Sequence, residues 1–98
     1  MKIQTIVPNT NAGAHCMHRL FNLTAQDIQA RLGFAANVKD DPSKVRYSWG
    51  FDVITEDGVT YTDLGIWDYK GSYLFQHFSA FGPLEVLEAL FPGHVITA

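Results

Sequence analysis

The sequence has a single cysteine, Cys16, so no disulfide can form within the chain. It has no apolar run of the roughly 18 residues that a membrane-spanning helix needs, and residues 1–20 lack the charged start and apolar stretch of a signal peptide. Seven Lys and Arg against ten Asp and Glu give a net charge of −3, without the basic stripe typical of nucleic-acid-binding proteins. We therefore expect a cytoplasmic protein that spans no membrane and does not bind nucleic acid directly.

The composition is that of a folded chain. Hydrophobic residues make up 47% and charged residues 17% of the 98 residues, which is enough to build an apolar core. The length predicts one domain, residues 1–98, with residues 1–22 as an N-terminal arm or strand and residues 23–93 as the core. A domain this small buries a modest fraction of its surface, so dimerisation or a partner would stabilise it.

Two helices are predicted from their start and stop signals. In LTAQDIQARLGF, Thr24 is suited to the N-cap position, Asp27 to the third helical position of a capping box, and Gly33 to the left-handed residue that ends the helix. The second helix follows Gly82-Pro83, has apolar residues at Leu84, Leu87, Leu90 and Phe91, and stops at Pro92-Gly93.

Between the helices, the pattern predicts three antiparallel strands. VRYSWGFDVIT alternates apolar and polar residues, as a half-buried strand does, and Asp57-Gly58 marks a two-residue hairpin. Residues 68–71, DYKG, fit a type I turn with a glycine bulge, after which residue 72 begins the third strand. The expected fold class is α+β, a three-stranded antiparallel meander between two helices (α-β-β-β-α). MKIQTIV is compatible with an extra N-terminal edge strand.

This register predicts a second, partly aromatic face on the side of the sheet away from the helix. Three rows of neighbours are expected there: Ser48/Trp67/Tyr73, Gly50/Gly65/Phe75 and Asp52/Asp63/His77. Phe75 would fill the gap left by two glycines. The candidate partner-binding residues are therefore Trp67, Tyr73, Phe75, Asp52, Asp63 and His77.

Two interpretations of this face stay open. Either residues 1–20 fold over its aromatic part, or that part is a surface for a partner protein or a second copy of the chain. The row of Asp52, Asp63 and His77 is interpreted as a hydrogen-bonded surface cluster, with a metal or acid–base site as the alternative.

The remaining motifs carry little chemistry. His15-Cys16-Met17-His18 contains zinc-type ligands, but zinc sites usually draw on pairs that are distant in the chain, so we interpret the segment as a polar loop or arm. Cys16 has no evident orienting residue or oxyanion hole, and the glycines follow no phosphate-loop pattern. We expect no enzyme activity, no catalytic residues, no metal and no cofactor.

Residues 24–92 resemble a family of small bacteriophage and prophage proteins. The resemblance rests on SWGF (Ser48 to Phe51), IWDYKGS (Ile66 to Ser72) and FGP (Phe81 to Pro83). It implies a setting in the cytoplasm of the host cell. There, such a protein would inhibit a host defence complex, for example a CRISPR effector, by direct binding. The alternatives are a homodimeric structural or regulatory phage protein and a small-ligand or metal-binding module.

Overall fold

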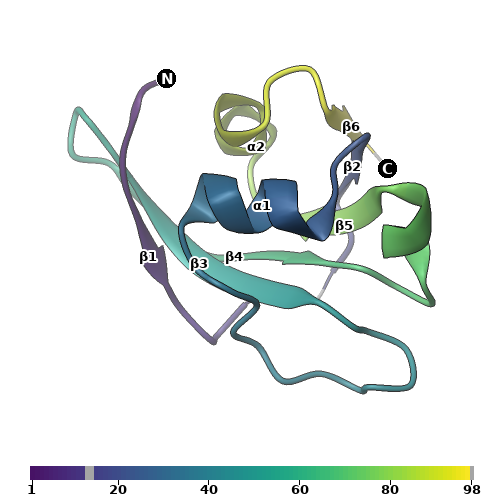
Figure 1. The fold of residues 1–98 in the computed structure, drawn as a ribbon. Helices are drawn as coiled ribbons and strands as arrows, with labels where there is room; N and C mark the ends of the chain where they lie inside the picture. The colour runs from purple at the N-terminus through teal and green to yellow at the C-terminus, as the bar shows by residue number, and fades with distance from the viewer. Residues whose placement is uncertain (13–14, 98) are drawn as a thin grey trace.

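The computed structural model describes residues 1–12 and 15–97. They form one six-stranded antiparallel sheet with two short helices (Figure 1). In chain order the elements are β1 (Ile3–Pro8), β2 (His18–Phe21), α1 (Ala25–Leu32), β3 (Ser48–Thr55), β4 (Thr60–Trp67), the 3₁₀ helix η1 (Ser72–Phe75), β5 (His77–Phe81), α2 (Leu84–Leu90) and β6 (Val95–Thr97). The strand order across the sheet is β1-β3-β4-β5-β2-β6.

The predicted α-β-β-β-α meander is therefore wrong, because the sheet has six strands and dominates the fold. The N-terminal strand exists at one edge, as β1. The two short strands β2 and β6 were missed because HRLF and VIT are too short to show an alternating pattern. β2 lies between β5 and β6, which are distant in sequence, so only tertiary pairing defines it.

The first hairpin has the expected register only near its base. Trp49 pairs with Ile66 and Phe51 with Leu64, as predicted. Beyond this point a bulge shifts the pairing, so that Val53 lies opposite Tyr61. The bulge places an extra residue on β4, and Asp63 within it has a φ of 61°, in the left-handed region.

The second turn differs most from the expectation. Ile66 pairs with Ala80, where Leu74 was predicted, so the third strand of the meander is β5 and begins at His77. Residues 72–75 form η1 instead of a strand. This six-residue displacement removes Tyr73 and Phe75 from the sheet.

Both helices lie on the same face of the sheet (Figure 1). The capping box of α1 is confirmed: the Asp27 amide donates to the Thr24 hydroxyl, and the Thr24 amide donates to the Asp27 carboxylate. The hydrogen bond from the Thr24 amide, followed by interaction with the Thr24 hydroxyl, lowers the pKa of Asp27 below its usual value. Gly33 ends the helix with a φ of 92°.

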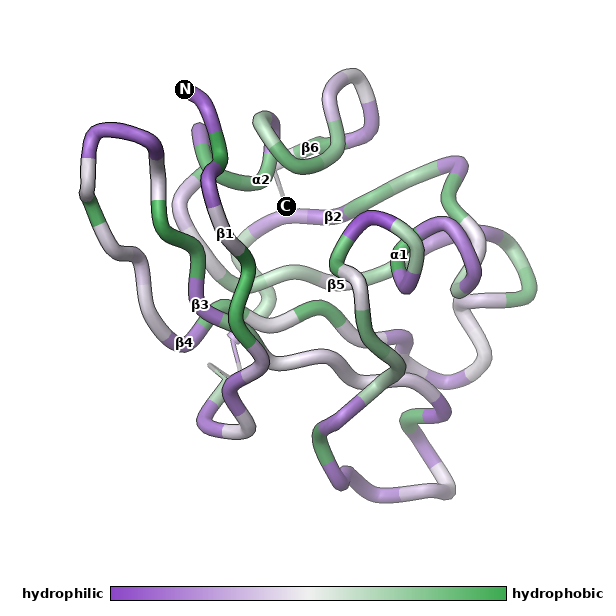
Figure 2. The backbone as a smooth tube through the Cα atoms, turned by 60° about the vertical axis from the view of Figure 1, so that its left-hand side comes forward, coloured by the Kyte–Doolittle hydropathy of each residue, from purple (hydrophilic) through white to green (hydrophobic). Residues whose placement is uncertain are grey.

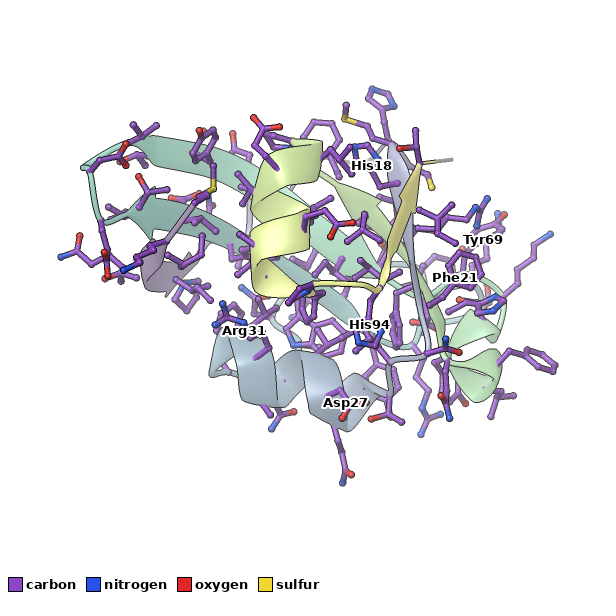
Figure 3. The ribbon with its side chains drawn as sticks, turned by 90° about the horizontal axis from the view of Figure 1, so that it is seen from above. His18, Phe21, Asp27, Arg31, Tyr69 and His94 are labelled. Carbon is purple, nitrogen blue, oxygen red and sulfur yellow. The ribbon has the colours of Figure 1, made fainter. Side chains whose placement is uncertain are left out.

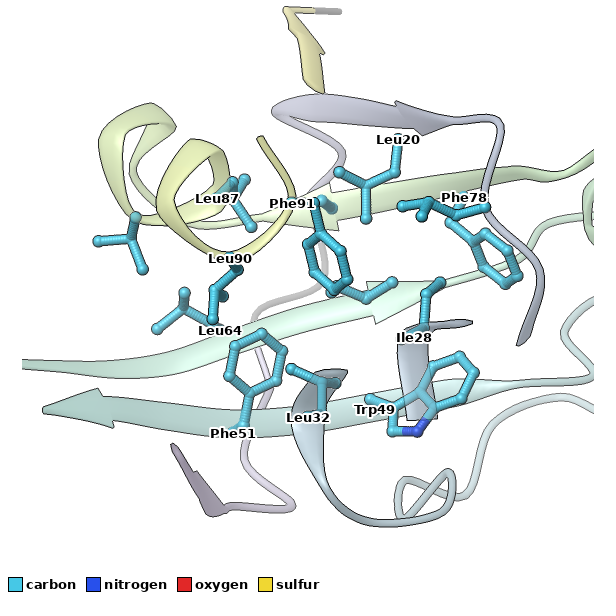
Figure 4. Packing of buried hydrophobic residues seen from close by; sticks show 14 of the residues in the cluster. Leu20, Ile28, Leu32, Trp49, Phe51, Leu64, Phe78, Leu87, Leu90 and Phe91 are labelled. Atoms are coloured by element: carbon cyan, nitrogen blue, oxygen red, sulfur yellow. The ribbon is translucent and has the colours of Figure 1, made fainter. Parts of the chain in front are cut away.

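The core fills the space between the helices and the sheet (Figure 4). Trp49, Phe51 and Leu64 project from the central strands, and the face of α1 that meets them carries Ile28 and Leu32. The other buried apolar residues are Leu20, Leu23, Val53, Ile66, Phe78, Ala80, Val86, Leu87, Leu90 and Phe91. Leu84 is 41% exposed, so Val86 takes the place that the predicted helix face gave to Leu84.

Two hydrogen bonds join segments that are distant in the sequence (Figure 3). Arg31 Nε on α1 donates to the carbonyl oxygen of Leu90 at 2.8 Å, where a cation meets the C-terminal end of α2 favourably. The Nδ1 atom of His94 lies 2.8 Å from the carbonyl oxygen of Phe21. Because a carbonyl only accepts, Nδ1 carries the proton in this contact.

Residues 9–12 and His15, between β1 and β2, lie on the face of the sheet away from the helices. The Asn9 amide donates to the Gly50 carbonyl at 2.9 Å. A Cβ atom on Gly50 would overlap the Asn9 carbonyl oxygen and approach Ala12 to 3.0 Å. The His15 ring packs near Phe81, with centroids 6.3 Å apart. Residues 9–12 and His15 therefore cover part of the second face.

The tip of the β3–β4 hairpin is hydrophilic (Figure 2). Among the described residues, no helix combines the length and the apolar character that crossing a membrane would require.

We predict that Gly50→Ala lowers the free energy of unfolding by about 1–3 kcal/mol, because the new methyl group overpacks against residues 9–12. The measurement is urea denaturation followed by tryptophan fluorescence. Thr62→Ala, an exposed position on β4, is the control and should change stability by less than about 0.5 kcal/mol. Equal stability of the two variants would show that residues 9–12 do not lie on Gly50.

Candidate binding surface

Asp68 organises the end of the sheet where β4 finishes. Its side chain is fully buried. The Oδ1 atom accepts hydrogen bonds from the amides of Arg46 at 2.9 Å and Tyr47 at 2.5 Å, and the Asp68 amide donates to the Tyr47 carbonyl at 3.1 Å. One carboxylate therefore joins the loop before β3 to the turn after β4.

Residues 69–76, which we call the apolar turn, follow Asp68 directly. The Tyr69 amide donates to the Ser72 hydroxyl at 3.0 Å, and this hydroxyl donates to the His77 carbonyl at 2.9 Å. Lys70 and Gln76 have φ values of 50° and 59°, in the left-handed region that costs energy for side chains other than glycine. Hydrogen bonds within the turn thus accompany a strained backbone.

The apolar turn presents its large side chains to solvent. Leu74 is 69% and Phe75 is 75% exposed, and Tyr69 is 47% exposed. Isolated apolar residues are common on protein surfaces, but neighbouring Leu and Phe on a protruding turn are typical of a contact site. Burial of each side chain in a partner would gain about 1.5–3 kcal/mol.

Tyr73 points in another direction and packs against the loop before β3. The Tyr47 and Tyr73 rings are almost perpendicular, at 80°, with centroids 5.4 Å apart. Tyr47 stacks in turn on Trp49. The guanidinium carbon of Arg46 lies 5.8 Å from the Tyr47 ring centroid and 5.6 Å from that of Tyr73. Interaction with the Tyr47 side chain, then with Tyr73, raises the pKa of Arg46 above its usual value.

Cations and carboxylates lie together at this end of the molecule. Lys44, Arg46 and Lys70 are there, and so are Asp68 and Asp41, whose carbonyl oxygen accepts a hydrogen bond from the Lys44 amide. The Lys70 amide donates to the Lys44 carbonyl at 2.6 Å, so the segments that contain these two residues are adjacent. The ammonium group of Lys70 lies 5.4 Å from the centroid of the Tyr69 ring. The exposed Tyr69 side chain therefore has a cation beside it.

The structure separates the predicted row of Asp52, Asp63 and His77. Asn9 Nδ2 donates to one oxygen of Asp52 and one of Asp63, both at 2.7 Å, and the Asp63 amide donates to Asp52 at 2.9 Å. His77 instead packs edge-on against Phe21, with centroids 4.2 Å apart. The two aspartates thus share an amide donor, and the described residues contain no cluster of three or more metal-ligating side chains.

Trp67 also lies apart from the other predicted aromatic residues. Across the sheet its neighbours are Ser48 and Ser79, not Tyr73. It is half-buried and lines a hollow of about 380 Å³ whose walls include Ala12 and Val38. Trp67, Tyr73 and Phe75 therefore do not form the single aromatic face that was predicted.

The HCMH segment is divided between solvent and the interior. Cys16 is exposed, and its thiol lies 3.4 Å from the carbonyl oxygen of His18. His18 itself is buried on the core side of β2. The absence of a metal site in this segment stays a prediction.

Sequence reasoning missed Tyr69 and Leu74 as surface residues and Lys44 and Arg46 as their neighbours. The alternation in residues 72–78 placed Leu74 in the core. Asp68 gave no usable local signal, because its carboxylate accepts hydrogen bonds from amides 21 and 22 positions earlier in the chain.

Comparison with known proteins gives no relative from which a function can be transferred. No family model matches the chain, and neither a curated protein nor a solved structure matches it significantly. Any function must therefore be argued from the surface itself.

We predict that Asp68→Ala lowers the free energy of unfolding by about 2–4 kcal/mol, because the part-buried amides of Arg46 and Tyr47 lose their acceptor. Asp68→Asn keeps one acceptor oxygen and should lose clearly less. Thermal and urea unfolding of both variants provide the measurement. If the two variants are equally stable, the hydrogen bonds to the two amides are not what Asp68 contributes.

Proposed function

We propose that the chain is a non-catalytic binding domain that inserts Leu74 and Phe75 into an apolar pocket of a partner protein. The observation that carries this proposal is the exposure of these adjacent side chains, 69% and 75%, on a turn whose backbone amides are hydrogen-bonded. Aromatic anchors contribute a large share of interface energy. A turn that already has its bound shape avoids part of the entropy cost of association.

The charges near the apolar turn support a partner of particular chemistry. Lys44, Arg46 and Lys70 would face the rim of the partner's pocket, so acidic residues at that rim would complement them. Such exposed pairs mainly increase the association rate and are screened by salt. Binding should therefore weaken as the ionic strength rises, while the apolar anchors keep most of the affinity.

We further propose that the partner is a host defence complex, such as a CRISPR effector, and that binding inhibits it. Support for this step comes from the resemblance to small phage proteins. One of the three motifs of that resemblance, IWDYKGS, contains Asp68 and the first part of the apolar turn.

We predict that Phe75→Glu leaves the fold intact but weakens partner binding at least about 30-fold, since a hot-spot side chain is lost and a charge enters an apolar pocket. The control is Val59→Glu, at a 44%-exposed position by the β3–β4 turn. Both variants should melt close to the parent.

The assay measures inhibition of target cleavage by a panel of purified CRISPR effectors, together with affinity capture from host lysate. The proposal requires a partner that the parent and Val59→Glu bind and that Phe75→Glu loses. Equal capture by all three would contradict the role of the apolar turn. Light scattering provides a separate outcome: a parent dimer that Phe75→Glu converts to a monomer would assign the turn to self-association.

A further inference from the structure

We propose that the hollow beside Trp67 is a binding site for a free aromatic amino acid, which places its ring against Trp67 and its two charged groups at the rim. The hollow has a volume of about 380 Å³, within the range of small-molecule sites. This inference is independent of the partner protein proposed above, because neither Leu74 nor Phe75 lines the hollow.

Aromatic side chains form part of the wall. Trp49 projects into the core, so its neighbour Ser48 and the paired Trp67 project from the other face of the sheet. Trp67 is half-buried there, and Tyr69, which is 47% exposed, also lines the hollow. Aromatic rings stack favourably on one another beyond the gain from burying their area. The wall therefore offers surface on which a planar ring can stack.

Val38 and Ala12 form an apolar part of the wall, because Gly50 leaves them room to approach the sheet. A Cβ atom on Gly50 would lie 3.0 Å from a methyl carbon of each residue. The Asn37 side chain donates to the Gly50 carbonyl at 2.9 Å and accepts from the Gly50 amide at 2.8 Å. The amides of Asn37 and Val38 both donate to the Ser48 carbonyl at 3.0 Å. Hydrogen bonds within the chain therefore hold this wall before a ligand binds.

The remaining apolar part of the wall comes from two segments that are in contact. Val45 lies in the loop before β3, and Tyr69 lies in the turn after β4. The Lys70 amide donates to the Lys44 carbonyl at 2.6 Å, so the backbones meet directly beside these two side chains. A ligand would thus enter a hollow whose walls are already ordered, which lowers the entropy cost of binding.

The rim of the hollow carries one charge of each sign. The adjacent residues Lys39 and Asp40 are exposed and line the hollow. One oxygen of Asp40 accepts a hydrogen bond from the Asp41 amide at 2.8 Å, which orients the carboxylate. A ligand with a single charge would be attracted by one rim residue and repelled by the other. A free amino acid has both charges, so its ammonium group complements Asp40 and its carboxylate complements Lys39.

The experiment titrates the ¹⁵N-labelled parent with phenylalanine and follows the indole N–H signals of its two tryptophans, with the Val38 amide, by NMR. We expect saturable shifts at Trp67 and Val38. The Trp49 signal should stay in place, because this side chain is buried and donates to the Phe34 carbonyl at 3.1 Å. Glycine lacks the ring and N-acetylphenylalanine amide lacks the charges, so each should bind about tenfold more weakly than phenylalanine.

Variants test the assignment of the site through the shift of the Val38 amide. Trp67→Leu should bind phenylalanine about tenfold more weakly, because the stacking surface is lost. Asp40→Asn keeps the oxygen that the Asp41 amide uses and should weaken binding about threefold through the loss of charge. Glu85→Gln removes the same charge from an exposed position on α2 and is the matched control, which should bind like the parent.

Three results would overturn the proposal. One is the lack of a saturable shift at Trp67 in the parent, which does not depend on whether Trp67→Leu folds. Another is equal affinity for phenylalanine and either glycine or N-acetylphenylalanine amide. The third is equal binding of phenylalanine by Asp40→Asn and Glu85→Gln.

Discussion

The hydrogen bonds accepted by Asp68 are the interaction on which the surface of this protein depends. The carboxylate is fully buried and binds the amides of Arg46 and Tyr47, so it fixes the loop before β3 against the turn after β4. That connection brings Arg46 over the Tyr73 ring and places the apolar turn at the end of the sheet. The six-stranded sheet supplies a rigid base, and Asp68 determines what this end presents to solvent.

Features that depend on neighbouring residues could be predicted from the sequence. The capping box at Thr24 and the left-handed Gly33 define α1, because caps act within one helical turn. The pairing of Trp49 with Ile66 followed from the Asp57-Gly58 turn and the alternation of apolar residues. Each of these signals lies within a few residues of the structure that it determines.

Features that depend on distant residues could not be predicted. The bulge at Asp63 is stabilised by Asp52 and by Asn9, which is 54 residues away. Strand β2 is defined by β5 and β6 alone. The prediction of the candidate site failed for the same reason. Asp68 accepts hydrogen bonds from amides 21 and 22 positions earlier, and the chain after it forms a 3₁₀ helix where a type I turn with a glycine bulge was expected. Of the predicted partner-binding residues, Phe75 remains in the proposed contact. It does so because it is exposed on the apolar turn, whereas the prediction placed it on the second face of the sheet.

The central claim is that the apolar turn has one fixed shape before any partner binds. Amide hydrogen exchange measured by NMR tests it most directly. The amides of Lys70, Ser72, Leu74 and Gln76 donate to backbone carbonyls at 2.6–3.1 Å, so they should exchange far more slowly than in an unstructured chain. Protection at these four amides, lost together in Asp68→Ala, is the result that we predict. Exchange at the rate of an unstructured chain in the parent protein would contradict the claim.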